Sequence, residues 1–242
     1  MRLKLGDHRV LAVSDLQEPF AHKDAFNFVS AVKEVYETDT TVFIGDEVDF
    51  HAISNKFIHD PDGRSAGDEL DLAVRAMRKW YGLFEGEGLV RVCTSNHTGR
   101  IFKTAFSAGI PRRFLRKVNE FLEAPDNFEW RDTWEVDGVR YEHGDNQGGM
   151  YAARQLALSN RQSTVIGHHH SHGGVNYMAN EFDTIFGLNV GCLIDRSAYV
   201  FDYGKGAKFK PTLGCGVVLY GVPKFVPMIV SGKQERWIGE VI

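Results

Sequence analysis

Short apolar runs alternate with helical patterns over the first hundred residues. The runs RVLAVSD (9–15), TVFIGD (41–46) and LVRVCTSNH (89–97) have the length and character of buried strands. Between them, residues 24–37 and 67–85 repeat apolar side chains at helical spacing. A strand–helix–strand–helix–strand order predicts parallel strands joined by right-handed crossovers. The chain is therefore expected to be an α/β protein.

The second half of the chain is richer in strands. TWEVDGVRYEHGD (133–145) predicts a hairpin that turns at Asp137 and Gly138, and STVIGH (163–168) predicts a further buried strand after a helix over 151–160. From Asn176 onward most segments read as strands, SAYVFDY (197–203) among them. The expected fold is two packed mixed β-sheets flanked by helices, with a helical insert at about 100–123, in a single domain over 1–242.

Composition narrows the class of protein. Hydrophobic residues make up 43% and charged residues 25%, and no run approaches the roughly 18 apolar residues of a membrane span. Cys93, Cys192 and Cys215 lie far apart, which favours neither a disulfide framework nor a thiolate zinc site. We expect a cytoplasmic protein without membrane contact, and the oligomeric state is left open. The net charge of −4 argues against nucleic-acid affinity over the whole surface, but it allows a local basic patch.

Metal-ligand side chains follow the predicted strands. Each of the segments SDLQ (14–17), GDEVD (45–49), SNH (95–97), YEHGD (141–145) and GHHH (167–170) places such residues directly after a strand. Taken singly, an Asp at a strand end is usually a cap or turn former, and a lone His is usually a core or surface residue. In open α/β sheets, however, ligands bind at the carboxyl ends of the strands. The regular order therefore predicts one shared site.

These segments resemble the signature of the calcineurin-like metallophosphoesterase family. That signature runs D-x-H, GD-x-x-D, GNH-D/E, a lone His and GH-x-H. This sequence has D-L-Q at 15–17, G-D-E-V-D at 45–49, S-N-H-T at 95–98, His143 and G-H-H-H at 167–170. NVGC at 189–192 resembles a further short segment of the family, so the match spans residues 9 to about 195.

The resemblance implies a site with two divalent metal ions. One ion would take Asp15, Asp46 and His170, and the other Asp46, Asn96, His143 and His168. Mn²⁺ is the expected ion, with Fe²⁺, Zn²⁺ or Ni²⁺ as alternatives, because carboxylate and imidazole ligands suit these metals. The implied reaction is hydrolysis of a phosphate ester by a metal-bridging hydroxide. His97 would be the general acid, and Asp49 would orient it.

Two departures from the family pattern bear on the site. Gln17 stands where the family has a histidine ligand, so the first ion would be held more weakly unless another group, such as His22 or His172, completes its shell. Phe50 replaces the arginine that follows GD-x-x-D in the protein-phosphatase branch, which argues against a Ser/Thr phosphatase of that kind.

A basic segment follows the predicted proton donor. Residues 100–117 contain six cations and no acid, and Arg100, Arg112 and Arg113 are candidate substrate-binding residues. Phe102, Phe106, Ile110, Phe114 and Val118 recur every four residues, which predicts a core stripe on two helices, the second starting at Pro111.

The basic face favours a phosphodiester substrate, nucleic acid or nucleotide, over a small phosphomonoester. A catalytically weak metal-binding scaffold is the alternative that Gln17 favours. A zinc-dependent nucleic-acid-binding module lacks the ligand pairing that such modules need.

Overall fold

The computed structural model describes residues 3–54, 64–198 and 208–242. Its first sheet has six strands in the order β11-β10-β1-β2-β3-β4. Strands β1 to β4 run parallel, as predicted, while β10 and β11 pair antiparallel at one side. The bounds are Arg9–Val13 for β1, Thr40–Phe43 for β2, Val90–Cys93 for β3, Phe128–Arg131 for β4, Gly214–Leu219 for β10 and Val222–Pro227 for β11.

The second sheet has five strands in the order β5-β6-β7-β9-β8. They span Thr133–Val136 (β5), Val139–Glu142 (β6), Thr164–Ile166 (β7), Gly174–Ala179 (β8) and Thr184–Asn189 (β9). The β5–β6 hairpin turns at Asp137 and Gly138, both in the left-handed region with φ of 53° and 75°, as predicted. A small two-stranded ribbon joins β12 (Val230–Ser231) to β13 (Arg236–Trp237). Most of the predicted strand over 197–203 lies outside the described residues.

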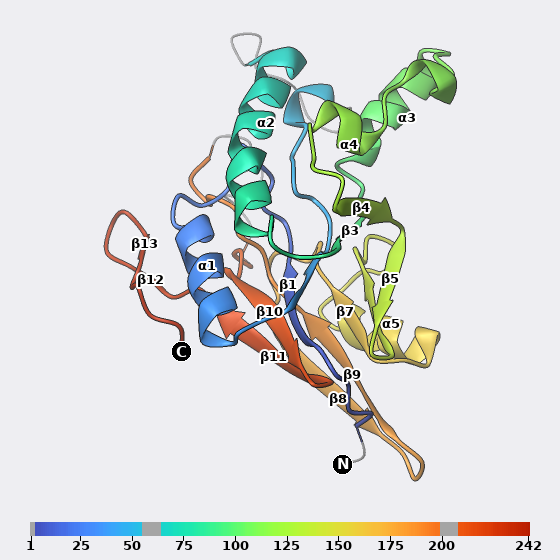
Figure 1. The fold of residues 1–242 in the computed structure, drawn as a ribbon, viewed down its shortest axis with the longest axis vertical. Helices are drawn as coiled ribbons and strands as arrows, with labels where there is room; N and C mark the ends of the chain where they lie inside the picture. The colour runs from blue at the N-terminus through green and yellow to red at the C-terminus, as the bar shows by residue number, and fades with distance from the viewer. Residues whose placement is uncertain (1–2, 55–63, 199–207) are drawn as a thin grey trace.

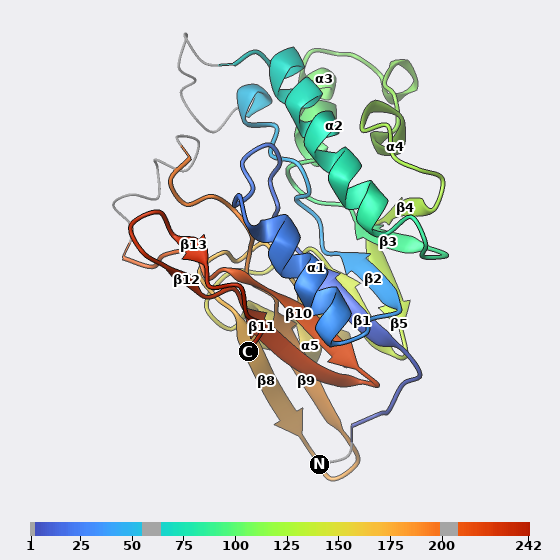
Figure 2. The same ribbon diagram turned by 60° about the vertical axis from the view of Figure 1, so that its left-hand side comes forward.

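The two sheets pack face to face between helices (Figures 1 and 2). Side chains alternate along β1, so that Leu11 and Val13 face the core under α1 and α2, while Val10 and Ala12 face the second sheet. Helix α5 packs on the outer face of the second sheet, where Leu156 meets Ile166. The bounds are Ala25–Val35 for α1, Ala66–Leu83 for α2 and Ala152–Asn160 for α5, with a 3₁₀ turn at His51–Ile53. The predicted fold class is confirmed.

The helical insert forms, but its predicted core stripe is wrong at three of its five residues, since only Phe102 is buried and only Val118 packs against the main core. It consists of α3 (Gly99–Ser107), a 3₁₀ turn at Arg112–Phe114 and the short α4 (Val118–Phe121), so Pro111 precedes a single 3₁₀ turn rather than a second long helix. Phe102 is buried, whereas Phe106, Ile110 and Phe114 are 48%, 41% and 72% exposed. Helical spacing shows which side chains share a face, but not whether another element covers that face. Both views place α3 at the end of the molecule opposite the β8–β9 hairpin (Figures 1 and 2).

In the part of the chain that the structure describes, no helix is both long and apolar enough to cross a membrane. The single domain over 1–242 stays a prediction.

Candidate metal centre

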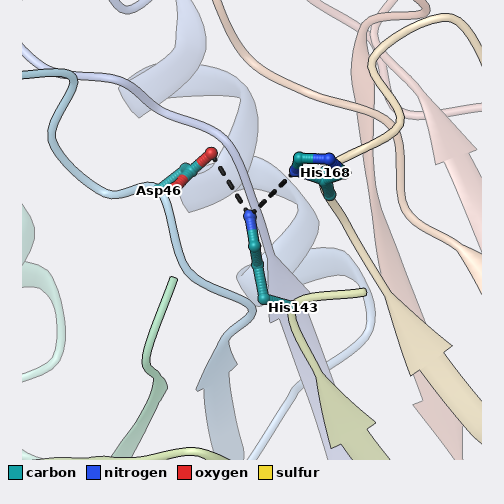
Figure 3. A group of neighbouring side chains, drawn as sticks. All are labelled: Asp46, His143 and His168. Carbon is teal, nitrogen blue, oxygen red and sulfur yellow. Dashed lines mark hydrogen bonds and ion pairs between the residues drawn. The ribbon is translucent and has the colours of Figure 1, made fainter. Parts of the chain in front are cut away.

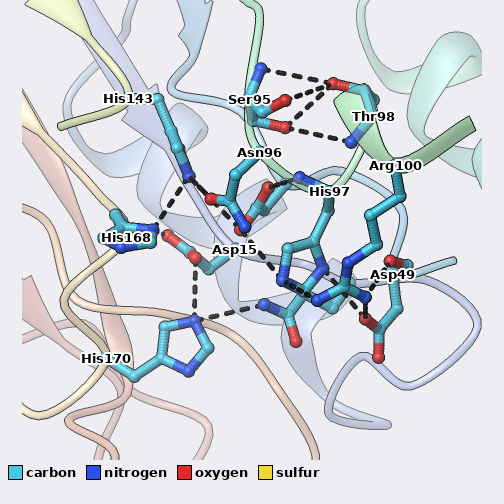
Figure 4. Close-up of polar contacts among 12 residues, drawn as sticks. Asp15, Asp49, Ser95, Asn96, His97, Thr98, Arg100, His143, His168 and His170 are labelled. Atoms are coloured by element: carbon cyan, nitrogen blue, oxygen red, sulfur yellow. Dashed lines mark hydrogen bonds and ion pairs between the residues drawn. The ribbon is translucent and has the colours of Figure 1, made fainter. Parts of the chain in front are cut away.

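The predicted ligands converge from both sheets at the carboxyl ends of their strands (Figure 4). Asp15, Asp46 and His143 are almost fully buried, and the backbones of Asp15 and Asp46 are left-handed, with φ of 50° and 51°. His168, after β7, is left-handed as well, with φ of 63°. Non-glycine residues seldom adopt this conformation, and where they do they often mark functional sites. Here all three residues lie within three residues of the end of a strand.

Acceptor groups gather around one ring nitrogen of His143. Its Nε2 lies 2.9 Å from Asn96 Oδ1, 3.1 Å from His168 Nδ1 and 3.3 Å from Asp46 Oδ2. Its other nitrogen, Nδ1, lies 2.8 Å from the Ile44 carbonyl oxygen and donates to it. In the neutral ring, Nε2 therefore carries a lone pair that faces other lone pairs.

This arrangement fits a divalent cation. The ligand atoms of Asp46, His143 and His168 all lie within 4.8 Å of one another (Figure 3). A carboxylate, an amide oxygen and two imidazoles are donors that Mn²⁺, Fe²⁺, Zn²⁺ and Ni²⁺ accept. The hydrogen bond from His143 Nδ1 to a backbone carbonyl is the kind of outer contact that orients metal-binding imidazoles.

A second group of ligand atoms lies beside the first. His170 Nε2 is 2.8 Å from Asp15 Oδ1 and 3.2 Å from Gln17 Nε2. A single ring nitrogen cannot both donate to Asp15 and accept from Gln17, and Gln17 Oε1 is buried without a hydrogen-bond partner among the described residues. A half-turn of the Gln17 amide exchanges its two atoms and brings Oε1 beside Asp15 and His170. These three residues then present the oxygen and nitrogen lone pairs that a cation needs.

Among the described residues, neither His22 nor His172 forms a hydrogen bond or ion pair with Asp15, Gln17 or His170. His22 is engaged at both ring nitrogens, by the carbonyl oxygen of Glu235 at 2.8 Å and the backbone N–H of Asp24 at 3.1 Å. His172 Nδ1 pairs with Ser171 Oγ at 3.0 Å. The assignment of Gln17 as a ligand at this position stays a prediction.

Burial and mutual charge set the protonation of the cluster. Burial alone would raise the pKa of Asp46, but the rings of His143 and His97 hold it well below its ordinary value. Burial opposes the charge on His143, yet Asp46 raises its pKa to about 10. Burial and the charge of His143 lower the pKa of His168 to about 4.

The pair formed by Asp15 and His170 behaves in the same way. Burial would raise the pKa of the Asp15 carboxyl, and the His170 ring lowers it. Conversely, burial would lower the pKa of His170, and Asp15 raises it. Without a metal, protons on His143 and His170 supply the positive charge that balances the buried carboxylates.

The predicted acid–base residues lie together at the edge of the cluster. His97 Nδ1 is 2.9 Å from Asp49 Oδ1, an ion-pair distance, although Nδ1 has no aligned hydrogen-bond partner among the described residues. A small rotation of the His97 ring would align Nδ1 with the Asp49 carboxylate. His97 Nε2 is 3.6 Å from Asp46 Oδ2, so this nitrogen borders the cluster.

Arg100 joins these two residues. Its guanidinium donates to Asp49 Oδ1 at 2.8 Å and to His97 Nε2 at 2.8 Å (Figure 4). The neutral His97 ring is thus an acceptor at Nε2, and it can donate from this atom only when it is protonated and Arg100 has turned away. Arg100, the first of the candidate substrate-binding cations, lies at the cluster.

The other two candidate cations lie on the insert. The Arg112 guanidinium is 4.1 Å from the centre of the Phe102 ring, and that of Arg113 is 5.6 Å from the centre of the Phe114 ring. No contact with the ligand cluster is recorded for either residue. Their part in substrate binding stays a prediction.

A pocket of about 280 Å³ adjoins the loop that carries His168 and His170. The backbone N–H of Thr212, one of its lining residues, donates to the His170 carbonyl oxygen at 2.6 Å. The lining residues are Met150, Tyr151, Ala153, Ser171, His172, Gly173, Gly174, Asn176, Asn189 and Thr212.

Sequence reasoning missed two groups that orient the ligands. Ser14 Oγ donates to Asp15 Oδ2, and the Ile44 carbonyl holds His143. The only feature of the sequence that points to Ser14 is its position directly before the predicted ligand Asp15. A backbone carbonyl leaves no signal in the residue types.

The known proteins that this chain resembles were found among solved structures. No family model matches the sequence, and no curated protein matches it. Vacuolar Protein Sorting 29 from Cryptosporidium parvum is 11% identical, with 89% of this chain and 86% of that chain covered, at a TM-score of 0.43. YfcE, a phosphoesterase from E. coli, is 14% identical over 97% of this chain and 98% of its own, at a TM-score of 0.41. The Pseudomonas putida nuclease MPE is 13% identical over 89% and 87%, at a TM-score of 0.36. Since these TM-scores lie below 0.5, the function has to be argued from the chain's own residues.

Proposed function

We propose that this chain is a metal-dependent phosphodiesterase that acts on nucleic acid or nucleotides. The observation that carries the proposal is the convergence of Asn96, His168 and Asp46 on Nε2 of His143. Asp15, Gln17 and His170 would hold a second ion, with Asp46 between the two groups. Two divalent ions there, with Mn²⁺ expected, would lower the pKa of bound water and polarise the phosphoryl oxygens.

The chain's own side chains would supply binding and proton transfer. Arg100 carries a cation to the edge of the cluster, where a phosphoryl oxygen could replace His97 Nε2 as its hydrogen-bond partner. Release of Arg100 frees His97 Nε2 to protonate the leaving oxygen, and Asp49 stays beside Nδ1 to stabilise the imidazolium.

A diester substrate is favoured over a monoester by the charge beyond His97. Residues 100–117 carry six cations and no acid, in a chain whose net charge is −4. Such a segment attracts a polyanion and positions its phosphates without reading its bases.

The test is metal reconstitution followed by hydrolysis of bis-p-nitrophenyl phosphate. We expect the metal-free wild-type chain to gain activity on addition of Mn²⁺, and Asp46→Asn to lose it with much weaker binding at both positions. Asp71→Asn is the matched control, because Asp71 is exposed on α2 and is not one of the candidate ligands. Wild-type metal content and turnover in Asp46→Asn would refute the two-metal proposal.

A phosphomonoesterase acting on a small phosphorylated molecule is the second candidate. It is favoured by the pocket of about 280 Å³ beside the His168–His170 loop, near the lower end of the size of small-molecule sites. Turnover of p-nitrophenyl phosphate well above that of the diester would select this function. A scaffold without activity would bind Mn²⁺ and hydrolyse neither ester.

We infer a reducing compartment, the cytoplasm, from the cysteines. Cys93, Cys192 and Cys215 are all buried free thiols, and burial raises the pKa of each. Thiols that are neither paired nor ionised are typical of proteins kept in a reducing environment.

A further inference from the structure

The insert after His97 exposes three large apolar side chains within nine residues. Phe106, Ile110 and Phe114 are 48%, 41% and 72% exposed. Single exposed apolar residues are ordinary in folded proteins, but these three recur at one spacing along one segment. Within the described residues, no element covers them.

The same segment carries cations that form no ion pair with a carboxylate among the described residues, although Arg112 and Arg113 lie over the rings of Phe102 and Phe114. These cations, Lys103, Arg112, Arg113, Arg116 and Lys117, are all exposed. Elsewhere on the surface, Arg9 and Arg131 each pair with a glutamate at 2.6 Å. The positive charge of the insert is therefore available to an external anion.

We propose that this surface, Phe106 and Phe114 with the five cations around them, binds single-stranded nucleic acid by stacking unpaired bases on the phenylalanine rings. The inference rests on the proposed function and specifies its substrate. Aromatic rings beside Lys and Arg are the combination by which proteins hold single strands without reading sequence, since every base offers a flat face. In a duplex, these faces are stacked inside and cannot reach the rings.

Continuity with the metal centre favours a strand over other occupants. Helix α3 begins at Gly99, two residues after His97, and Phe106 lies about 10 Å further along it. Arg100, in its first turn, contacts Asp49 and His97. A strand on the rings could therefore follow the cations to Arg100 and present a phosphodiester to the ligand cluster. An anionic membrane would also attract cations and rings, but it offers the metal centre no strand to cut.

The experiment compares oligonucleotide binding by the full, Mn²⁺-loaded chain and two double variants. Phe106→Ala with Phe114→Ala removes the platform, and Phe182→Ala with Tyr177→Ala removes two exposed rings, 75% and 45% exposed, from the β8–β9 hairpin. The probe is a fluorescein-labelled oligothymidylate with phosphorothioate linkages, read by fluorescence anisotropy. A second probe has the same backbone and no bases.

We expect the platform variant to bind oligothymidylate at least about 30-fold more weakly, since the loss of one stacked base weakens binding roughly 5- to 150-fold and the variant removes two rings. Its salt dependence should be unchanged, since the cations remain. Wild type should prefer the oligomer with bases, whereas the platform variant should bind both probes alike. The hairpin variant should behave as wild type.

Equal affinity of wild type and the platform variant for oligothymidylate would overturn the inference, as would equal affinity of wild type for both probes. Loss of binding to phosphatidylserine vesicles with unchanged oligonucleotide affinity would identify a membrane surface instead. Hydrolysis of bis-p-nitrophenyl phosphate, measured on the same proteins, tests the metal centre separately. A chain that binds strands by stacking but cleaves no diester would refute the proposed function and keep the platform.

Discussion

His97 shows how much one residue's surroundings decide its role. Its two ring nitrogens face opposite partners, Asp49 at Nδ1 and the Arg100 guanidinium at Nε2. A general acid needs the proton on the nitrogen that faces the leaving group, and only Nε2 borders Asp46. If His97 is the general acid, as proposed, its proton donation would require the release of Arg100.

Replacing His97 separates proton transfer from metal binding. We expect His97→Ala to keep its metals and to lose roughly 10²- to 10⁴-fold in kcat on diesters with alkoxide leaving groups, the usual scale for a general acid. The loss should be smaller with p-nitrophenolate, which leaves without a proton. Kinetics with good and poor leaving groups, together with metal analysis, measure both. The same loss for both leaving groups would remove His97 from this role.

Gln17 allows a substitution that is expected to strengthen metal binding instead of weakening it. Gln17→His should raise Mn²⁺ affinity at the position beside Asp15 and His170, because imidazole is a stronger donor to this ion than a neutral amide oxygen. Gln17→Ala should lower the affinity. Calorimetric titration reads both, and unchanged affinity in the two variants would place Gln17 outside the coordination shell.

The residue types predicted which side chains form the candidate ligand cluster, but not the contacts and orientations of the side chains around it. Asp15 and Asp46 could be placed together because the ends of the neighbouring parallel strands β1 and β2 meet at one sheet edge. His143 follows β6 in the second sheet, so its place beside them depends on how the two sheets pack. The Arg100 contacts could not be predicted, since they depend on the direction in which α3 leaves β3. The orientation of the Gln17 amide depends on its neighbours in space, which the sequence does not order.

Helices and strands could be predicted from the sequence where burial requires a regular pattern of apolar residues. The strands β1, β2 and β3 were expected from apolar runs, and all are buried on both faces. Three residues of the stripe on the insert were wrongly predicted to lie in the core, because the sequence does not show where the insert lies relative to the sheets. Helix α3 extends beyond the sheets (Figure 1), and Phe106, Ile110 and Phe114 remain exposed there, whereas Val118 of α4 packs against the core.

The C-terminal ribbon is joined to α1 by one ion pair that gives stability a pH dependence. Arg236 donates twice to Asp24, at 2.6 and 2.7 Å, and lowers the pKa of the Asp24 carboxyl to about 2. A depressed carboxyl pKa stabilises the fold above its unfolded value near 3.8, and this stabilisation is lost as the pH falls through 2.

Asp24→Asn should therefore lower Tm by roughly 2 °C at pH 7, a small effect because water screens the Arg236 end of the pair. The difference from wild type should shrink as the pH is lowered from 4 toward 2. Thermal unfolding over this range is the measurement, with Asp71→Asn on the exposed side of α2 as the control. A difference that stays constant from pH 7 to the lowest pH at which the chain is folded would show that the ion pair is not its cause.

Charge is divided unevenly over the whole molecule. The segment 100–117 carries six cations, so a net charge of −4 for the chain leaves −10 on the remaining residues. Outside this segment the acidic surface would repel a polyanion, and the insert is the one predicted route by which a nucleic acid approaches the ligand cluster.

Reversing Arg112, Arg113 and Arg116 to Glu should raise KM for an oligonucleotide. The slope of log affinity against log salt concentration should become shallower by about 2, because each of three lost phosphate contacts on a single strand contributes about 0.7. Turnover of bis-p-nitrophenyl phosphate should barely change, because a small diester needs only the metal centre and Arg100. The matched control reverses Lys23, Lys208 and Lys233, which are exposed and lie outside the insert, so that the net charge changes equally. If both triple variants raise KM alike, net charge and not the position of the cations governs the approach of the substrate, and the basic insert is solvated surface.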